Sequence, residues 1–279
     1  MNDNEFNALV SLLEDDDKDI RRHVEARLRE MGIEIVPRLR EYMEATTDTK
    51  LQGRIEDVII EMQSMLHITD LQAWFADENP EKDMLRAWFS VSKYLYPTLD
   101  FELIRKEITR LASRTWLEIK YGTTAPEKLI VINRMFFRKE MYRPSRKGVT
   151  EPDCYFVNHV LERRRGVPLS LCLLYAIVCR ELEIDIRLIL LPSGYAVLYY
   201  HDNRNEVFVD VFNKGAFFSR SDLRRFLKEN DIEDAPTFYL PAEPNAVILA
   251  LLDTLIEVYD YEEDADNAQL IRILREAVA

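Results

Sequence analysis

The sequence predicts an α+β protein in which helices dominate. Glycine is scarce, with 7 in 279 residues, and apolar residues recur at helical spacing through most of the chain. Three strand-like runs lie close together between residues 186 and 212. Glycine supplies the positive φ angles that phosphate-binding loops need. Because neither a GxGxxG nor a GxxxxGKS/T pattern occurs, the sequence excludes dinucleotide-binding and P-loop folds.

Charge and cysteine usage limit the possible partners and cofactors. Asp and Glu number 50 against 37 Lys and Arg, giving a net charge of −13, so we expect no nucleic-acid partner. The three cysteines (Cys154, Cys172 and Cys179) follow no CxxC spacing, which indicates neither a disulfide scaffold nor a zinc ribbon. No cofactor or metal is expected. The absence of a signal peptide and of a long apolar run predicts a cytoplasmic protein without a membrane partner.

Residues 1–66 are expected to form a HEAT-like helical unit. Apolar residues of the second and fourth predicted helices superpose at an offset of about 31, a spacing close to that of HEAT repeats. The matching positions are Ile20, Val24 and Leu28 with Leu51, Ile55 and Ile59. The acidic run at residues 15–17 indicates a solvated turn and helix cap, because no turn glycine or distal Glu completes a calcium loop.

Residues 67–150 are expected to form a helical bridge that packs on the following domain. Asn79-Pro80 has the pattern of an N-cap followed by proline in the first helical turn. A further helix is predicted from Phe101 to Ile119, and Pro126 is expected to open another. Aromatic residues at helical spacing between residues 74 and 94 indicate packed core rather than a ligand box.

Residues 151–240 change in character. A helix is predicted over Phe156–Arg165, ending at Gly166. Pro168 then opens a nearly all-apolar, and therefore buried, helix that runs to Leu182. The three strand-like runs follow it, at Ile186–Leu191, Tyr195–Tyr200 and Val207–Phe212.

This order of a buried helix and an antiparallel meander resembles the papain-like transglutaminase core. The motifs themselves are similar to those of the SirB-type transglutaminase-like family of bacteria. They are LIVINRMFF (129–137), FVNHVLERRRGVPLSLCLLYAIVCREL (156–182), LPSGYAVL (191–198) and FVDVFNKG (208–215). The family commonly ends in a tetratricopeptide-like segment, which the resemblance assigns to a helix pair in residues 241–279, at Asn245–Tyr261 and Ala265–Ala277.

The resemblance also implies where a catalytic triad would lie. The nucleophilic Cys of transglutaminases belongs at the start of the buried helix, where the helix dipole lowers a thiol pKa; Ser170 occupies that region. The His belongs on the second strand, where Gly194 or Tyr195 stands, and the acid belongs at Asp210. The family's usual Asn ahead of the VLERRR helix is replaced by Cys154.

Several residues near this region have alternative interpretations. Cys172 is either a displaced nucleophile or a small buried hydrophobe. His159 is either a base that reaches Cys172 or a satisfied surface histidine. Arg163, Arg164 and Arg165 either pair with acidic residues or form an anion-binding or acidic-partner site. We expect Asp210 to pair with one of these arginines, because an unpaired buried carboxylate is costly.

Three hypotheses for function follow. The first is a catalytically degenerate member, a pseudoenzyme that acts as a protein-binding or regulatory module with an unknown protein partner. The second is a cryptic cysteine or serine hydrolase, or an acyl transferase, that uses Cys172 or Ser170 with His159 or an unconventional base. The third is a structural adaptor in which residues 1–66 bind the partner. The oligomeric state is left open.

Overall fold

The chain divides into two compact units, Met1–Asp70 and Leu71–Ala279. A computed structural model describes residues 3–121, 123–145, 147, 150–192, 194–202, 205–229 and 231–279. The predicted boundary after residue 66 falls inside a helix, α4, that begins at Thr49 and ends at Ala76. The finer division of the second unit into bridge, core and C-terminal pair stays a prediction.

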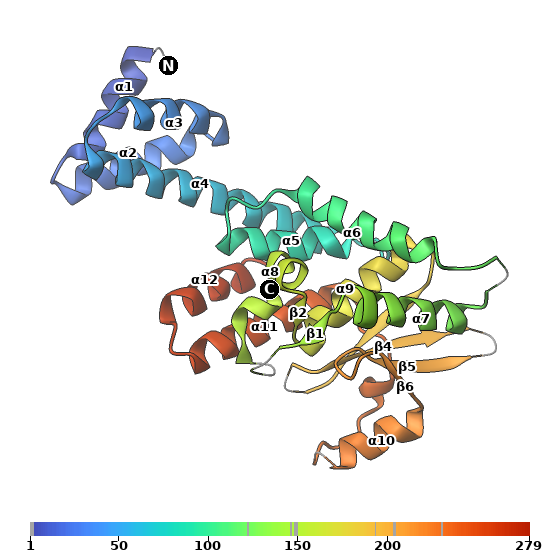
Figure 1. The fold of residues 1–279 in the computed structure, drawn as a ribbon. Coiled ribbons are helices and arrows are strands. Elements are labelled where there is room, and N and C mark those ends of the chain that lie inside the picture. Colours follow the sequence, from blue (N-terminus) through green and yellow to red (C-terminus); the bar gives the residue numbers. More distant parts are fainter. Residues whose placement is uncertain are drawn as a thin grey trace. The chain divides into compact units, whose positions relative to one another are not determined.

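The first unit is helical around its own apolar core. Its helices are α1 (Asp3–Ser11), α2 (Lys18–Glu30), α3 (Val36–Ala45) and the first part of α4 (Thr49–Ala76) (Figure 1). Val24, Leu28, Leu51, Ile55 and Ile59 are all buried in this core, as their spacing predicts. Ile20 is the exception, because it is 40% exposed.

The acidic run caps α2. The Asp17 side chain accepts a hydrogen bond of 2.8 Å from the Asp19 backbone N–H, which satisfies one of the free donors of the first turn. Lys50 forms an ion pair of 2.7 Å with Asp16. After α2, Gly32 takes a φ of +80°, a left-handed conformation that few other residues adopt without strain.

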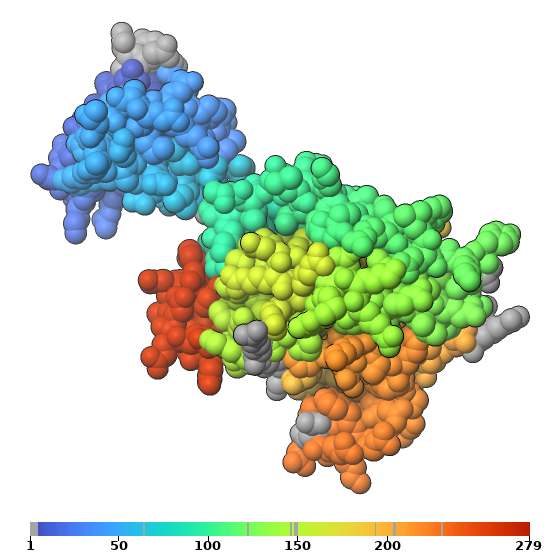
Figure 2. Space-filling model, viewed as in Figure 1, coloured from blue at the N-terminus to red at the C-terminus, as the bar shows by residue number. Residues whose placement is uncertain are grey.

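The second unit combines helices with small sheets, which confirms the α+β class. Its helices are α5 (Met84–Leu95), α6 (Phe101–Trp116), α7 (Ala125–Arg134), α8 (Val157–Arg163), α9 (Pro168–Glu181), α10 (Arg220–Glu229), α11 (Pro244–Tyr261) and α12 (Ala265–Glu276). A single π-helical turn, Met135–Lys139, continues α7. In Figure 2 the green residues of α5 and α6 lie beside the yellow-green residues of α8.

The predicted helix start at Asn79-Pro80 is wrong. The Asn79 side chain instead accepts a hydrogen bond from the Glu81 backbone N–H, which makes a turn. Lys82 fixes this turn, because its ammonium group donates to the carbonyls of Trp74 and Asp77 at the end of α4. The cap of α5 is Asp83, whose carboxylate accepts from the Leu85 N–H at 3.0 Å.

The predicted meander is confirmed, with one additional strand. The antiparallel sheet has the order β3-β4-β5-β6, formed by β3 (Ile186–Leu190), β4 (Ala196–His201), β5 (Glu206–Asp210) and β6 (Ala216–Phe218) (Figure 1). Opposite pairs include Leu188 with Leu198 and Leu198 with Val209. A two-residue parallel pair, β1 (Arg143–Pro144) with β2 (Arg165–Gly166), lies apart from this sheet.

Helix α8 ends two residues earlier than its pattern predicts. Arg164 takes a left-handed conformation with φ +52°, which stops the helix at Arg163. Arg165 and Gly166 then form β2, and Pro168 opens α9. Because α9 is apolar around most of its circumference, it lies at the centre of the unit, in contact with α6, α8, β3 and β4.

Candidate functional site

The first turn of α9 places Ser170 in a fully buried hydrogen-bond network. Its hydroxyl donates to the Cys154 carbonyl at 2.6 Å and accepts from the Val167 N–H at 3.0 Å. The Val167 N–H precedes the helix and would otherwise lack a partner inside the protein. The Ser170 hydroxyl therefore ties the start of α9 to the segment before α8, and its proton points to a carbonyl rather than to a base.

We expect Ser170→Ala to lower the free energy of unfolding by about 1–3 kcal/mol, because it leaves buried backbone groups unsatisfied. Tryptophan fluorescence during urea unfolding measures this change, since Trp74, Trp88 and Trp116 all lie in the second unit. The matched control is Ser90→Ala, a buried helical serine whose hydroxyl makes no hydrogen bond among the described residues; it should stay within about 1 kcal/mol of the parent. Equal stability of both variants would contradict the structural role of Ser170.

Cys172 lies one half-turn further along α9 and faces the sheet. Its thiol donates a hydrogen bond of 3.4 Å to the Ala196 carbonyl at the start of β4. Burial, and then the nearby charge of Asp210, raise the pKa of this thiol well above its usual value. The structure thus brings α9, β4 and the end of β5 together at Cys172, but in an environment that disfavours the thiolate.

Asp210 pairs with none of Arg163, Arg164 and Arg165, so that expectation is wrong. Its carboxylate accepts hydrogen bonds from the backbone N–H groups of Phe212 and Asn213, the latter at 3.0 Å. Burial raises the pKa of Asp210, and these two N–H donors oppose that shift. Backbone N–H groups of the turn after β5 thus take the place of the arginine that we expected. A tight turn leaves its own N–H groups free to form such hydrogen bonds.

The two positions that would hold a histidine are occupied differently. Gly194 has φ +72°, and a Cβ there would lie 2.9 Å from Thr254 Cγ2 on α11 and 3.5 Å from the Tyr155 hydroxyl. A side chain at residue 194 is therefore sterically excluded unless α11 shifts. Tyr195 is 38% exposed, and its ring contacts those of Phe212 and Phe226.

His159 is held away from both candidate nucleophiles. Its Nε2 lies 3.9 Å from Asp153, its Nδ1 lies 4.0 Å from Glu162, and its ring packs edge-on against Tyr96. Burial lowers the pKa of His159, against the opposing charge of Asp153. No hydrogen bond in the described part of the chain joins a histidine to Ser170 or Cys172.

Comparison with known proteins decides the family of the chain. The sequence profile of the transglutaminase-like superfamily matches residues 102–253, more than half of the chain. The chain belongs to the transglutaminase-like superfamily. The matched range contains α9, β4 and β5, the elements that meet at Cys172.

Two curated relatives resemble this transglutaminase-like chain, and both match it over the same number of residues. They are UPF0162 proteins of two strains of Xylella fastidiosa, Temecula1 and 9a5c, each 26% identical over 179 residues. The match covers 62% of this chain and 63% of each relative, so it spans less than two thirds of their length. No solved structure matches the chain. The finer assignment to the SirB-type family stays a prediction.

The three arginines of the transglutaminase-like motif point to separate partners. Arg163 forms an ion pair of 2.6 Å with Asp153, and Arg165 donates to the Pro144 carbonyl at 3.3 Å. Arg164 donates to both the carbonyl and the carboxylate of Glu140, at 2.6 and 2.7 Å. Their guanidinium groups are therefore engaged within the fold, and they do not converge on a shared anion site.

Glu140 is a structural feature that our sequence analysis did not identify. Its carboxylate is 2% exposed and contacts three guanidinium groups, those of Arg110, Arg114 and Arg164. Burial by itself would raise the pKa of Glu140, but the hydrogen bond and charge of Arg110, with the other two charges, lower it overall. The spacing of Arg110 and Arg114, four residues apart on a predicted helix, is the one sequence signal from which a shared acidic partner could have been inferred.

The cysteines and the possible metal ligands were the remaining candidates for chemistry. Cys154, Cys172 and Cys179 are free and buried. Within the described residues, no group of three or more His, Cys, Asp or Glu side chains has the arrangement of a metal site. No helix in the described part of the chain is both long enough and apolar enough to cross a membrane.

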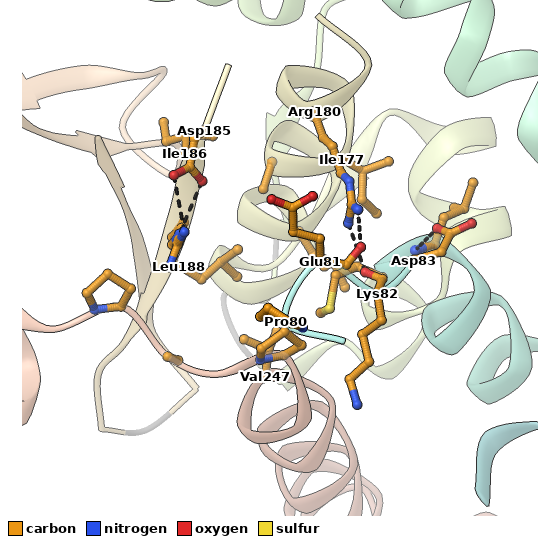
Figure 3. A pocket seen from close by; sticks show the side chains of 18 of the residues that line it. Pro80, Glu81, Lys82, Asp83, Ile177, Arg180, Asp185, Ile186, Leu188 and Val247 are labelled. Atoms are coloured by element: carbon orange, nitrogen blue, oxygen red, sulfur yellow. Dashed lines mark hydrogen bonds and ion pairs between the residues drawn. The ribbon is translucent and has the colours of Figure 1, made fainter. Parts of the chain in front are cut away.

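A pocket of about 780 Å³ opens beside the second half of α9 (Figure 3). Its walls come from α9, from β3, from the turn before α5 and from the segment that leads into α11. Arg180 on α9 donates to the backbone carbonyls of Glu81 and Lys82, as the dashed lines in Figure 3 show. The sequence does not reveal this pocket, because turns about 160 residues apart both contribute to its lining.

Proposed function

We propose that this transglutaminase-like protein is catalytically degenerate and acts as a protein-binding or regulatory module. The observation that carries the proposal is the environment of Cys172. Where α9, β4 and β5 meet, the thiol donates to a carbonyl and lies within the field of the Asp210 carboxylate, and among the described residues no hydrogen bond joins it to an imidazole. An acyl-transfer site of this kind needs a thiolate, a base and an orienting acid together.

The electrostatics at Cys172 oppose nucleophilic catalysis. A cationic neighbour or an open helix N-terminus lowers a thiol pKa and produces the reactive thiolate. Here burial and the charge of Asp210 act in the opposite direction and raise the pKa. The Cys172 thiol is therefore a protonated, packed side chain at neutral pH.

Ser170 is no better placed as a nucleophile. A serine hydroxyl attacks a carbonyl only when a base removes its proton. The Ser170 proton is donated to the Cys154 carbonyl at 2.6 Å, and a carbonyl oxygen is not a base at neutral pH. The other base that the sequence offers is His159, which lies 3.9 Å from Asp153 and packs its ring edge-on against Tyr96.

Thiol labelling tests the proposal. We expect that iodoacetamide leaves all three cysteines of the folded protein unmodified during a time in which free glutathione reacts completely, because only thiolates react and these thiols are buried. Burial, with the charge of Glu151, raises the pKa of Cys154 to about 12. Unfolding in guanidinium chloride should make all three cysteines reactive, as intact mass spectrometry would show.

Two outcomes would overturn the proposal. One is fast labelling of Cys172 in the folded protein, lost in Cys172→Ala. The other is covalent transfer of an amine donor to a glutamine substrate, lost in the same variant. Cys179→Ala serves as the control, because Cys179 lies two turns further along α9 and is equally buried.

A further inference from the structure

The pocket beside α9 carries unpaired negative charge. Every cationic side chain that lines it is already engaged: Arg105 with Asp83, Arg187 with Asp185, Arg180 with two backbone carbonyls, and Lys82 with the end of α4. Five lining carboxylates take part in no ion pair among the described residues. They are Asp77, Glu81, Glu181, Glu183 and Glu243.

These carboxylates are exposed at the rim, so their charge is available to a ligand. The pKa of Arg187 is raised first by its hydrogen bond with Asp185, and also by the charges of Asp185, Glu243 and Glu81. The walls of the pocket thus act as one negative field rather than as isolated charges. The chemistry that complements this field is cationic.

The floor of the pocket is apolar. It contains Ile177 on α9, Ile186 and Leu188 on β3 and Val247 on α11, each less than 8% exposed (Figure 3). A small polyamine would pair with the rim but would make little apolar contact with this floor. A ligand that combines cations with apolar groups would cover both.

One wall also offers a strand edge. β3 is the edge strand of the four-stranded sheet, and its Leu188 carbonyl accepts from the Ala242 N–H at 2.8 Å. In an antiparallel strand, alternate residues direct their backbone groups to the same side, so the Ile186 carbonyl also faces this outer edge. No hydrogen bond to that carbonyl is found among the described residues. Ala242 therefore covers this edge at Leu188, and the Ile186 carbonyl is left as an acceptor for the backbone N–H of an extended ligand.

We propose that this pocket binds an extended basic segment of a partner protein. Its Lys or Arg side chains pair with the rim carboxylates, its apolar side chains cover the floor, and its backbone contacts the edge of β3. This inference rests on the proposed function, because it assigns the partner's chemistry to a binding module. The binding site then lies beside the C-terminal half of α9, away from the N-terminal turn of that helix.

Fluorescence anisotropy with the full chain tests the inference. The probe is a labelled peptide of about eight residues that alternates lysine and valine, which spans roughly 26 Å when extended. A matched peptide that alternates glutamate and valine, and spermidine alone, are the comparison ligands. We expect saturable binding of the lysine peptide only, weakening as salt is raised from 50 to 500 mM because the rim charges are exposed.

Charge-reversal variants locate the site. We expect the triple variant Glu81→Lys, Glu181→Lys and Glu243→Lys to bind the lysine peptide at least about tenfold more weakly. The control variant, Glu41→Lys, Glu56→Lys and Asp57→Lys, makes the same change in net charge at exposed positions of the first unit and should change affinity less than about twofold. Circular dichroism would establish that both variants remain folded, since all six side chains are on the surface.

Three results would overturn the inference: no binding of the lysine peptide at millimolar concentration, equal weakening in the two triple variants, or equal binding of the glutamate peptide. Any of these, with unreactive cysteines, leaves the proposed function intact. Peptide binding together with labelling of Cys172 would instead overturn the proposed function and leave the pocket as a binding site.

Discussion

Replacing Glu140 with alanine should lower the free energy of unfolding of the second unit by roughly 2–4 kcal/mol. The Glu140 carboxylate is 2% exposed and is shared by Arg110, Arg114 and Arg164. Removing it leaves three guanidinium groups facing one another without a counter-charge. The loss stays at the lower end of the range for breaking a buried pair, because those arginines are 35–49% exposed and can regain water.

The matched control for Glu140 is Glu118→Ala. Glu118 also holds two cations, Arg134 and Lys139, but its side chain is 23% exposed. Surface pairs contribute little, so this variant should lose much less stability than Glu140→Ala. Urea unfolding followed by tryptophan fluorescence compares the two variants, and equal losses would contradict the special role of Glu140.

The contribution of Glu140 should depend on pH. The pKa of Glu140 is lowered in the folded protein from its usual value of 4.5, so the unfolded chain takes up a proton before the folded protein does. Its stabilising effect is therefore fully present above that value and is lost as the pH falls through the lower, folded pKa. We expect the difference between parent and Glu140→Ala to shrink below pH 4.5 and to be constant between pH 6 and 8.

Gly215→Ala should destabilise the second unit by roughly 2–4 kcal/mol. Gly215 has φ +77°, and a Cβ there would lie 2.1 Å from Asn133 Oδ1. Asn133 cannot move without loss, because its amide donates to the Gly215 carbonyl at 2.7 Å and its Oδ1 accepts from the buried Tyr175 hydroxyl at 2.9 Å. The substitution thus adds backbone strain and breaks a polar link between α7, α9 and the turn before β6.

The neighbouring residue provides the control. Lys214 also has a positive φ, of 58°, but its side chain is exposed. Lys214→Gly relieves the left-handed strain without removing a contact and should be neutral or stabilising by up to about 1 kcal/mol. Opposite signs for the two variants in the same unfolding experiment would support the steric argument; a loss of stability in both would indicate that the whole turn is intolerant of change.

Most of the secondary structure could be predicted from local patterns. Pro168 and the apolar run after it gave the start and the burial of α9, and the strand-like runs gave β3, β4 and β5 within one or two residues. The prediction at Asn79-Pro80 failed because Asp83 caps the helix instead, and the Lys82 ammonium group holds the turn before it against the end of the preceding helix. Such competition between two caps is not visible in a local pattern.

The candidate site was predicted less completely than the fold. The sequence placed Ser170, Asp210 and the helix of Cys172 near one another through the family resemblance. It did not predict that backbone N–H groups, rather than an arginine, would satisfy Asp210. Nor did it predict that Thr254 of α11 would close the space at Gly194, because α11 begins about 50 residues later in the chain.

The sequence by itself determined the periodicity of the helices and the order of α9 and the meander. These are properties of neighbouring residues, because helix and strand formation depend on spacings of two to four positions. Only the tertiary structure decided the environment of each reactive group. The pKa of Cys172, the three cations at Glu140 and the unpaired acids of the pocket depend on charges and burial contributed by segments far apart in the chain.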